Sequence, residues 1–120
     1  MKYDDNNIFA KILREEIPCK KVFENEYALA FHDINPQAKL HILVIPKGKY
    51  ISFADFSKNG SKDEIEGFFK VVGKVAEDQN LVEGGYRLLA NHGVNAGQEV
   101  PHFHIHIFGG QQLGPMISKN

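Results

Sequence analysis

The sequence of 120 residues has no tryptophan, only one cysteine and no long hydrophobic run. A single thiol, Cys19, cannot close a disulfide within the chain or build a zinc knuckle, a pattern typical of proteins of a reducing compartment. No stretch approaches the roughly 20 apolar residues that span a bilayer. The first residues, MKYDDNN, also lack the apolar core and cleavage site of a signal peptide. We therefore expect a soluble, cytoplasmic protein with no membrane partner.

An excess of positive charge is also missing. Fourteen Lys and Arg residues are balanced by 15 Asp and Glu, so the net charge is -1. Binding of a nucleic-acid backbone by counterion release is therefore not expected. With 42% hydrophobic and 24% charged residues, the chain has the composition of one compact domain. We predict a single domain over residues 7–120, preceded by a polar, disordered segment at residues 1–6.

The hydrophobic patterns predict an α+β fold in which an antiparallel sheet of about five strands is combined with two helices. Asn7 is a candidate cap for a short helix that Pro18 ends. Ser61 and Glu64 form a capping box ahead of a longer amphipathic helix. Strands are expected at residues 21–24, 28–33, 41–45, 86–91 and 102–108.

The most informative segment is the last of these strands, because it holds three of the six histidines at every second position. Successive side chains of a strand point to opposite faces. His102, His104 and His106 are therefore expected to share one face, while the apolar residues between them point into the core.

Three interpretations of this face follow from the residues. It could be an ordinary solvated face of a strand. It could bind zinc, but the outer two imidazoles would start about 13 Å apart, whereas a zinc ion binds nitrogen at about 2.1 Å. Two of the three could share an ion; convergence of all three is awkward. Finally, one neutral histidine could act as a nucleophile, with its neighbours orienting it and donating hydrogen bonds to a phosphate.

The segment His-Phe-His-Ile-His-Ile-Phe at residues 102–108 resembles the signature of the histidine triad (HIT) superfamily. Further segments are similar to its Hint branch, so that the likeness covers residues 8 to about 116. These segments are residues 8–12, 16–18, 30–38, 41–47, 85–87 and 97–100.

This resemblance implies a HIT-like fold and a homodimer that binds purine nucleotides such as AMP or GMP. It also implies hydrolysis of nucleoside 5'-phosphoramidates, such as adenosine 5'-monophosphoramidate, through a nucleotidyl-histidine intermediate. By position, His104 corresponds to the nucleophile and His106 to the residue that contacts the phosphate and leaving group. His102 and His41 correspond to the residues that orient and tune the nucleophile.

The resemblance also implies a nucleotide pocket. Its candidate residues are Ile8, Phe9, Phe31, His32 and Ile34 around the base, Asp33 at the ribose hydroxyls, and Asn91, Gly97, Gln98 and Glu99 at the phosphate. Ordinary roles explain some of these residues equally well. Phe31 and Ile34 could simply pack in the core, and Asp33, just before Asn35-Pro36, could be a turn residue.

No Walker loop or cluster of acidic magnesium ligands occurs in the sequence, so we expect neither a metal nor a cofactor. Glu99 stands where many relatives have Ser or Thr, and its carboxylate could alter the leaving-group preference. Three other functions stay open at this point: a non-catalytic nucleotide-binding regulator, a metal-binding module, and a dinucleoside polyphosphate hydrolase of the same superfamily.

Overall fold

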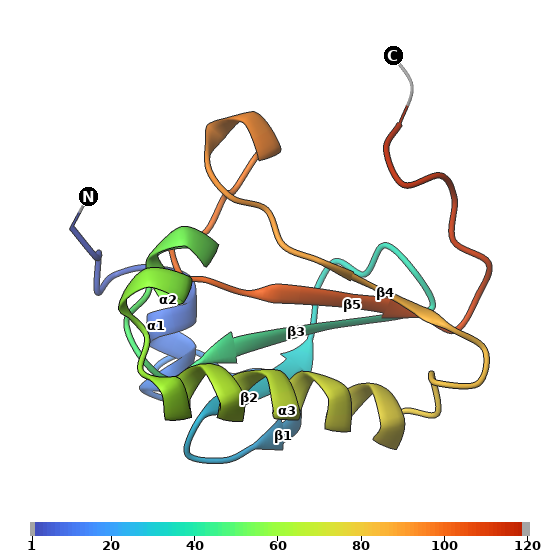
Figure 1. Ribbon diagram of the computed structural model, residues 1–120, viewed down its shortest axis with the longest axis horizontal. Coiled ribbons are helices and arrows are strands. Elements are labelled where there is room, and N and C mark those ends of the chain that lie inside the picture. Colours follow the sequence, from blue (N-terminus) through green and yellow to red (C-terminus); the bar gives the residue numbers. More distant parts are fainter. Residues whose placement is uncertain (1, 119–120) are drawn as a thin grey trace.

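The computed structural model describes residues 2–118, which form one five-stranded antiparallel sheet flanked by helices (Figure 1). The strands are β1 (Lys21–Glu24), β2 (Ala28–His32), β3 (Leu40–Pro46), β4 (Tyr86–Leu89) and β5 (Ile105–Gly109), and they lie in the order β1-β2-β3-β5-β4. The helices are α1 (Ile8–Leu13), α2 (Phe53–Asn59) and α3 (Lys62–Asp78), with a short 3-10 turn at Val94–Ala96. The α+β fold and the antiparallel sheet are confirmed.

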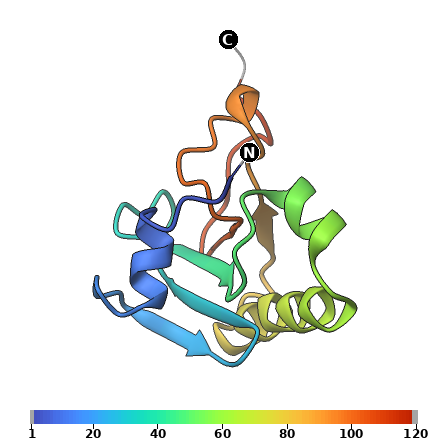
Figure 2. The same cartoon turned by 90° about the vertical axis from the view of Figure 1, so that its left-hand side faces the viewer.

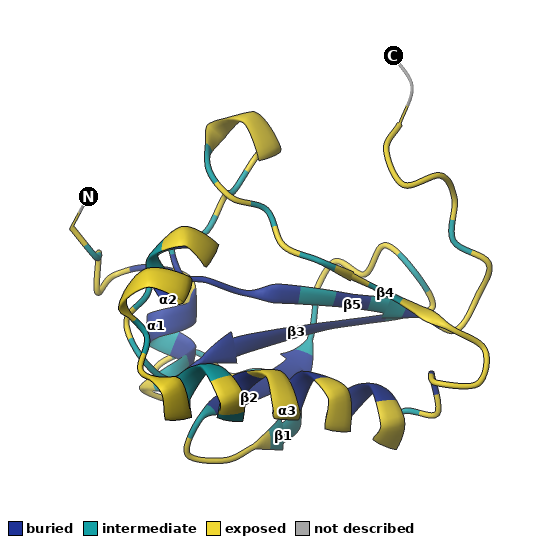
Figure 3. Cartoon of the chain, in the orientation of Figure 1, coloured by how far each residue is buried: buried dark blue, intermediate teal, exposed yellow. Residues whose placement is uncertain are grey.

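Helices α1 and α3 lie on opposite faces of the sheet (Figure 2). Alternation along the strands divides the buried residues between two cores. Facing α3 are residues such as Ala30, Val44 and Ile107, together with the apolar stripe of the helix. Facing α1 are residues such as Phe31 and Leu43. The central strands are therefore buried on both faces (Figure 3).

The two predicted helix starts are confirmed at the level of single hydrogen bonds. The Asn7 side chain accepts a bond from the Ala10 N–H, and α1 follows directly. At α3, the Ser61 and Glu64 side chains each bind the other's backbone N–H, which completes the capping box. No helix among the described residues is long and apolar enough to cross a membrane.

The prediction of two helices was wrong, because the described residues contain a third, α2. Seven residues with three apolar positions give too weak a periodic signal for a sequence pattern. The helix is held by tertiary packing instead. Phe56 is buried and stacks on Phe103 with ring centroids 5.1 Å apart.

The last strand was predicted from residue 102 but begins at Ile105. Pairing between β3 and β5 ends at Val44 and Ile105, and Pro46, two residues further along β3, has no N–H to donate. The segment before β5 is bound differently: the Phe103 N–H donates to the Tyr50 carbonyl at 2.7 Å. His102 and His104 therefore precede the strand, whereas His106 lies within it.

The N-terminal segment was expected to be disordered. Met1 lies outside the described residues, whereas residues 2–6 make specific contacts with the domain. Asp5 pairs with Lys49 at 2.8 Å, and the Asp5 carbonyl accepts a hydrogen bond from Arg14. The Tyr3 hydroxyl reaches His102.

Candidate active site

The three histidines of the signature gather on the α1 side of the sheet. Phe103, between the first two of them, points into the core below α3. His102 and His104 are buried, and the His104 and His106 rings are 5.1 Å apart between centroids. The predicted division into an imidazole side and a core side therefore holds, although only His106 has strand geometry.

One chain of hydrogen bonds fixes the tautomers of His102 and His104. The Pro46 carbonyl can only accept, so its 2.9 Å contact with His102 Nε2 puts the proton on Nε2. His102 Nδ1 then carries a lone pair and accepts the Tyr3 hydroxyl at 2.5 Å. His104 Nδ1–H donates to the His102 carbonyl at 2.7 Å. A neutral His104 therefore has a free lone pair on Nε2.

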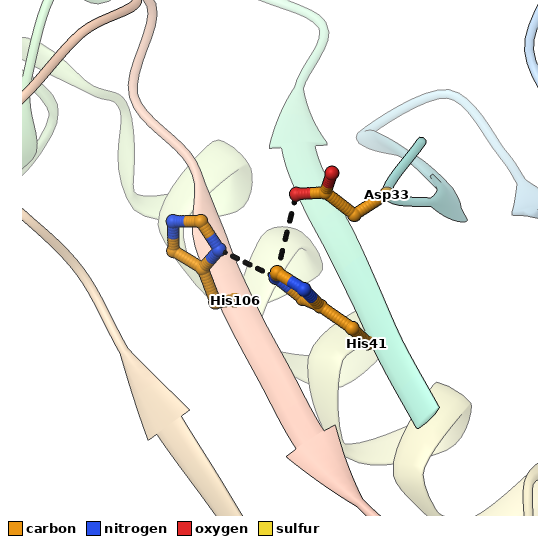
Figure 4. A group of neighbouring side chains, drawn as sticks. All are labelled: Asp33, His41 and His106. Atoms are coloured by element: carbon orange, nitrogen blue, oxygen red, sulfur yellow. Dashed lines mark hydrogen bonds and ion pairs between the residues drawn. The ribbon is translucent and has the colours of Figure 1, made fainter. Parts of the chain in front are cut away.

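A second chain fixes His41 and His106. The Gln37 backbone N–H donates to His41 Nδ1 at 3.1 Å, so the proton of neutral His41 is on Nε2. His41 Nε2–H donates to His106 Nδ1 at 2.9 Å (Figure 4). A neutral His106 consequently carries its own proton on Nε2. The two chains leave His104 as an acceptor and His106 as a donor.

Burial keeps these imidazoles neutral near pH 7. It lowers the pKa of His102 to about 4, with the nearby His104 adding to the effect and the bond to the Pro46 carbonyl opposing it. It also lowers the pKa of His106 to about 4, with His104 and His41 adding to the effect and Asp33 opposing it. The pKa of His104 is lowered in the same direction, again mainly by burial.

Asp33 and His41 are close enough for an ion pair, with Oδ2 3.4 Å from Nε2. Burial nevertheless outweighs the carboxylate and lowers the pKa of His41. We therefore treat His41 as neutral. The second Asp33 oxygen accepts the Asn35 N–H at 2.8 Å. Asp33 is thus both a turn residue and a neighbour of the histidine cluster.

A cavity of about 450 Å³ opens beside these histidines. His104 and His106 line it, whereas His102 and His41 lie behind them. All ten predicted nucleotide-binding residues are in its wall: Ile8, Phe9, Phe31, His32, Asp33, Ile34, Asn91, Gly97, Gln98 and Glu99. The wall combines apolar residues of α1 and β2 with polar residues of the loops, a mixture typical of ligand pockets.

The model of the HIT domain family matches residues 14–113. This chain belongs to the HIT domain family. It is 62% identical over 117 residues to a 13.2 kDa HIT-like protein of Azospirillum brasilense, with 98% of this chain and 96% of that protein covered. It is 40% identical over 114 residues to the purine nucleoside phosphoramidase of Escherichia coli K12, with 95% of each covered.

Solved structures of the family have the same fold. A histidine triad protein from Clostridium difficile superposes with a TM-score of 0.85 at 39% identity, covering 98% of this chain and 100% of that one. A HIT family hydrolase from Legionella pneumophila gives a TM-score of 0.84 at 39% identity, covering 91% and 96%.

The end of the cavity that was predicted to hold the base is built by α1 and β2. Phe31 is buried in the floor, and Phe9 packs edge-on against it, with centroids 5.7 Å apart. Phe9 also lies edge-on to His104 at 4.9 Å. Ile34 is 93% exposed, so it contributes a rim and not core packing. Phe31 is thus both core and pocket, while for Ile34 the core interpretation was wrong.

Gln98 lines the cavity, but its amide group is engaged with the protein backbone. Its Nε2 donates to the carbonyls of Ile51 and Val100, and its Oε1 accepts the Gly93 N–H. All three side-chain bonds stay within the loops. Gly97 next to it has φ of 71°, a left-handed conformation that favours glycine. The Gln98 side chain therefore fixes the loop of residues 93–100 to the segment that holds Ile51.

Three groups that position the histidines were missed by sequence reasoning. They are the Gln37 N–H, the Pro46 carbonyl and the Tyr3 hydroxyl. Backbone groups carry no residue-type signal, so the first two could not have been found. Tyr3 was placed in a segment expected to be disordered, although an aromatic residue among polar ones offered a signal.

Among the described residues, Asp33, His41 and His106 form a group whose ligand atoms all lie within 4.8 Å of one another. The zinc interpretation had paired only histidines of the signature. Tetrahedral zinc with bonds of about 2.1 Å would hold its nitrogens roughly 3.4 Å apart. His41 Nε2 and His106 Nδ1 are 2.9 Å apart, the distance of a hydrogen bond. A shared proton therefore fits between these nitrogens better than an ion.

Proposed function

We propose that this HIT protein hydrolyses purine nucleoside 5'-phosphoramidates, with His104 as the nucleophile. The observation that carries the proposal is the His104 Nδ1–H bond to the His102 carbonyl, which leaves the Nε2 lone pair available beside the cavity. A neutral, correctly tautomerised imidazole is what nucleophilic attack requires. The 40% identity to a purine nucleoside phosphoramidase supports the substrate class.

The first step forms a bond between His104 Nε2 and the α-phosphorus and breaks the phosphorus–nitrogen bond to the amine. The departing amine takes up one proton from solvent. The neutral His106 ring, whose other nitrogen accepts from His41, keeps its Nε2–H and donates it as a hydrogen bond to the phosphate. As positive charge develops on the His104 ring, its Nδ1–H bond to the His102 carbonyl strengthens. The bond therefore stabilises the positive charge that develops on His104 in the transition state.

The second step is attack by water on the phosphorus of the nucleotidyl-histidine. The bond to His104 Nε2 breaks, the nucleotide leaves as the monophosphate, and the attacking water releases one proton to solvent. Over the full cycle, one water is consumed and one amine and one nucleoside monophosphate are formed.

The test is to trap the intermediate. Wild-type protein is mixed with adenosine 5'-monophosphoramidate, quenched within milliseconds and digested, and the nucleotidyl group is located by mass spectrometry. We expect the adduct on His104 and a loss of about 10⁴-fold or more in kcat for His104→Ala. The Kd of His104→Ala for AMP, measured by calorimetry, should stay within about threefold of the wild-type value. The nucleophile acts in the chemical step, and its removal leaves the rest of the pocket in place.

His92→Ala is the matched control, since His92 is exposed and does not line this cavity. Full activity of His104→Ala would remove the mechanism. AMP binding without turnover by the wild type would instead support a regulatory nucleotide-binding protein. A substrate panel that includes dinucleoside polyphosphates, with and without chelator, separates the other two alternatives.

We also propose that the chain forms a homodimer. Strand β4 pairs with β5 and lies at an edge of the sheet, where Tyr86 and Leu88 are 39% and 45% exposed. An apolar edge strand can pair with another chain. Light scattering behind size exclusion should give a mass of two chains, and Leu88→Lys should lower it.

A further inference from the structure

The N-terminal segment delivers a side chain to the histidine site. Residues 2–6 run beside the start of α1, where the Asn7 amide donates to the Asp4 carbonyl at 2.8 Å. The pair of Asp5 and Lys49 holds the same segment to the loop after β3. Between these anchors and the chain end, Tyr3 turns its ring toward His102, with centroids 5.6 Å apart and an edge-on angle of 71°.

The Tyr3 hydroxyl is the only hydrogen-bond donor that His102 Nδ1 has among the described residues. His102 is 0% exposed, so water does not reach Nδ1. Nε2 is occupied by the Pro46 carbonyl at 2.9 Å. Without the hydroxyl, Nδ1 would be a buried acceptor without a donor, which is unfavourable enough to make the ring and its backbone rearrange.

The position of His102 matters because its backbone holds His104. The His102 carbonyl is the acceptor for His104 Nδ1–H. A shift of the His102 ring therefore moves the group that sets both the tautomer and the aim of the nucleophile. Small errors in aim have large effects on rate, since attack requires alignment with the reacting phosphorus.

We propose that Tyr3 is a positioning residue: by donating its hydroxyl hydrogen to His102 Nδ1, it holds the His102 ring in place and thereby aligns His104 for attack. This inference rests on the proposed function, in which His104 is the nucleophile. It adds the N-terminal segment to the active site, and it assigns that segment an effect on the chemical step and not on nucleotide affinity.

Tyr3→Phe is the decisive variant, because it keeps the ring against His102 and removes only the donor. We expect kcat for adenosine 5'-monophosphoramidate to fall about tenfold, while KM stays within about twofold, since Tyr3 does not line the cavity. In substrate-free protein labelled with ¹⁵N-histidine, the Nδ1 signal of His102 should move to that of an imine nitrogen without a hydrogen bond. The His104 ring signals should shift as well.

Tyr27→Phe is the matched control, because Tyr27 lies at the turn before β2, against Gly67 of α3, and should change neither reading. Thermal melts check that Tyr3→Phe is folded. Unchanged imidazole signals, or changed signals with wild-type kcat, would overturn the proposal. Failure of the proposed function is distinguishable: the wild type would then turn over no phosphoramidate, while the substrate-free imidazole signals would still report whether Tyr3 holds His102.

Discussion

The two faces of the sheet bury different kinds of side chain. The α3 face buries the larger apolar core, including the rings of Phe56, Phe68 and Phe103 packed within 5.4 Å of one another between centroids. The α1 face has a smaller apolar cluster, a cavity and the buried imidazoles. Among residues 2–118, every buried polar side-chain atom nevertheless has a hydrogen-bond partner.

This difference indicates that the two faces of the sheet have different roles. Burial of apolar surface stabilises the fold at roughly 25 cal/mol per Å². Along β3, Val44 contributes to this burial on the α3 face, whereas His41, three residues earlier, points to the other side. A cavity and neutral imidazoles reduce that gain on the α1 face but provide room and reactive nitrogens. The α3 face should therefore control stability and the α1 face chemistry.

The sharpest way to break this comparison is to remove a large ring from the α3 face. Phe68 is 0% exposed and contacts Phe56 and Phe103. Phe68→Ala should lower the free energy of unfolding by about 3–5 kcal/mol, because it removes buried apolar surface and leaves a cavity. The kcat per folded molecule should stay within about twofold. Urea titration and steady-state assay of the same sample measure both quantities.

Phe69→Ala is the control on the next residue of the same helix, where the ring is 41% exposed. Its loss should be about 1 kcal/mol or less. A Phe68→Ala protein that stays stable but loses activity would show that the two faces are not separate in function.

The second prediction concerns stability on the α1 face as a function of pH. Burial puts the pKa of His102 at about 4 in the folded chain, below its ordinary 6.5. Between these values the unfolded state binds more protons, so stability is full above pH 6.5 and falls as the pH drops toward 4. The shift corresponds to about 3 kcal/mol for His102, and His106 acts in the same direction.

Urea unfolding at pH 7, 6 and 5 measures this slope. His102→Gln should flatten it, whereas His92→Gln, at an exposed position, should leave it as in the wild type. Phe68→Ala should lower stability by the same amount at every pH, since it titrates no group. A wild-type stability that does not change from pH 7 to 5 would contradict the neutral state assigned to the buried imidazoles.

The sequence predicted the α3 face and the pocket wall more fully than the hydrogen bonds that hold the histidines. Five strands were located because alternation and turn residues repeat a simple period, and α3 because Ser61 and Glu64 mark its start. The pocket residues were implied by family resemblance, and the cavity wall contains all of them. Period and residue type were sufficient signals for the strands and for α3, whereas the pocket wall was predicted only through the resemblance.

The tautomers could not be predicted in the same way. They depend on which backbone group meets each ring nitrogen, and the Pro46 carbonyl and Gln37 N–H are decided by loop geometry. The strand start was misplaced for a related reason, since the strand pattern continues back to His102 while the pairing with β3 stops at Ile105. Gln98 was predicted at the phosphate, and the sequence does not reveal that backbone groups occupy its side-chain amide.

The smallest expected effects compare two glycines of α3. An added Cβ at Gly67 would lie 2.3 Å from the Tyr27 ring, whereas at Gly73 nothing lies within 4 Å. Gly73→Ala should therefore stabilise the protein by about 1 kcal/mol through helix propensity. Gly67→Ala should be less stable than the wild type, because the ring must move, and Tyr27→Ala in the same chain should restore the gain. Equal stabilisation by both glycine variants would contradict the close packing at Gly67, and any change in kcat would link the outer side of α3 to the site.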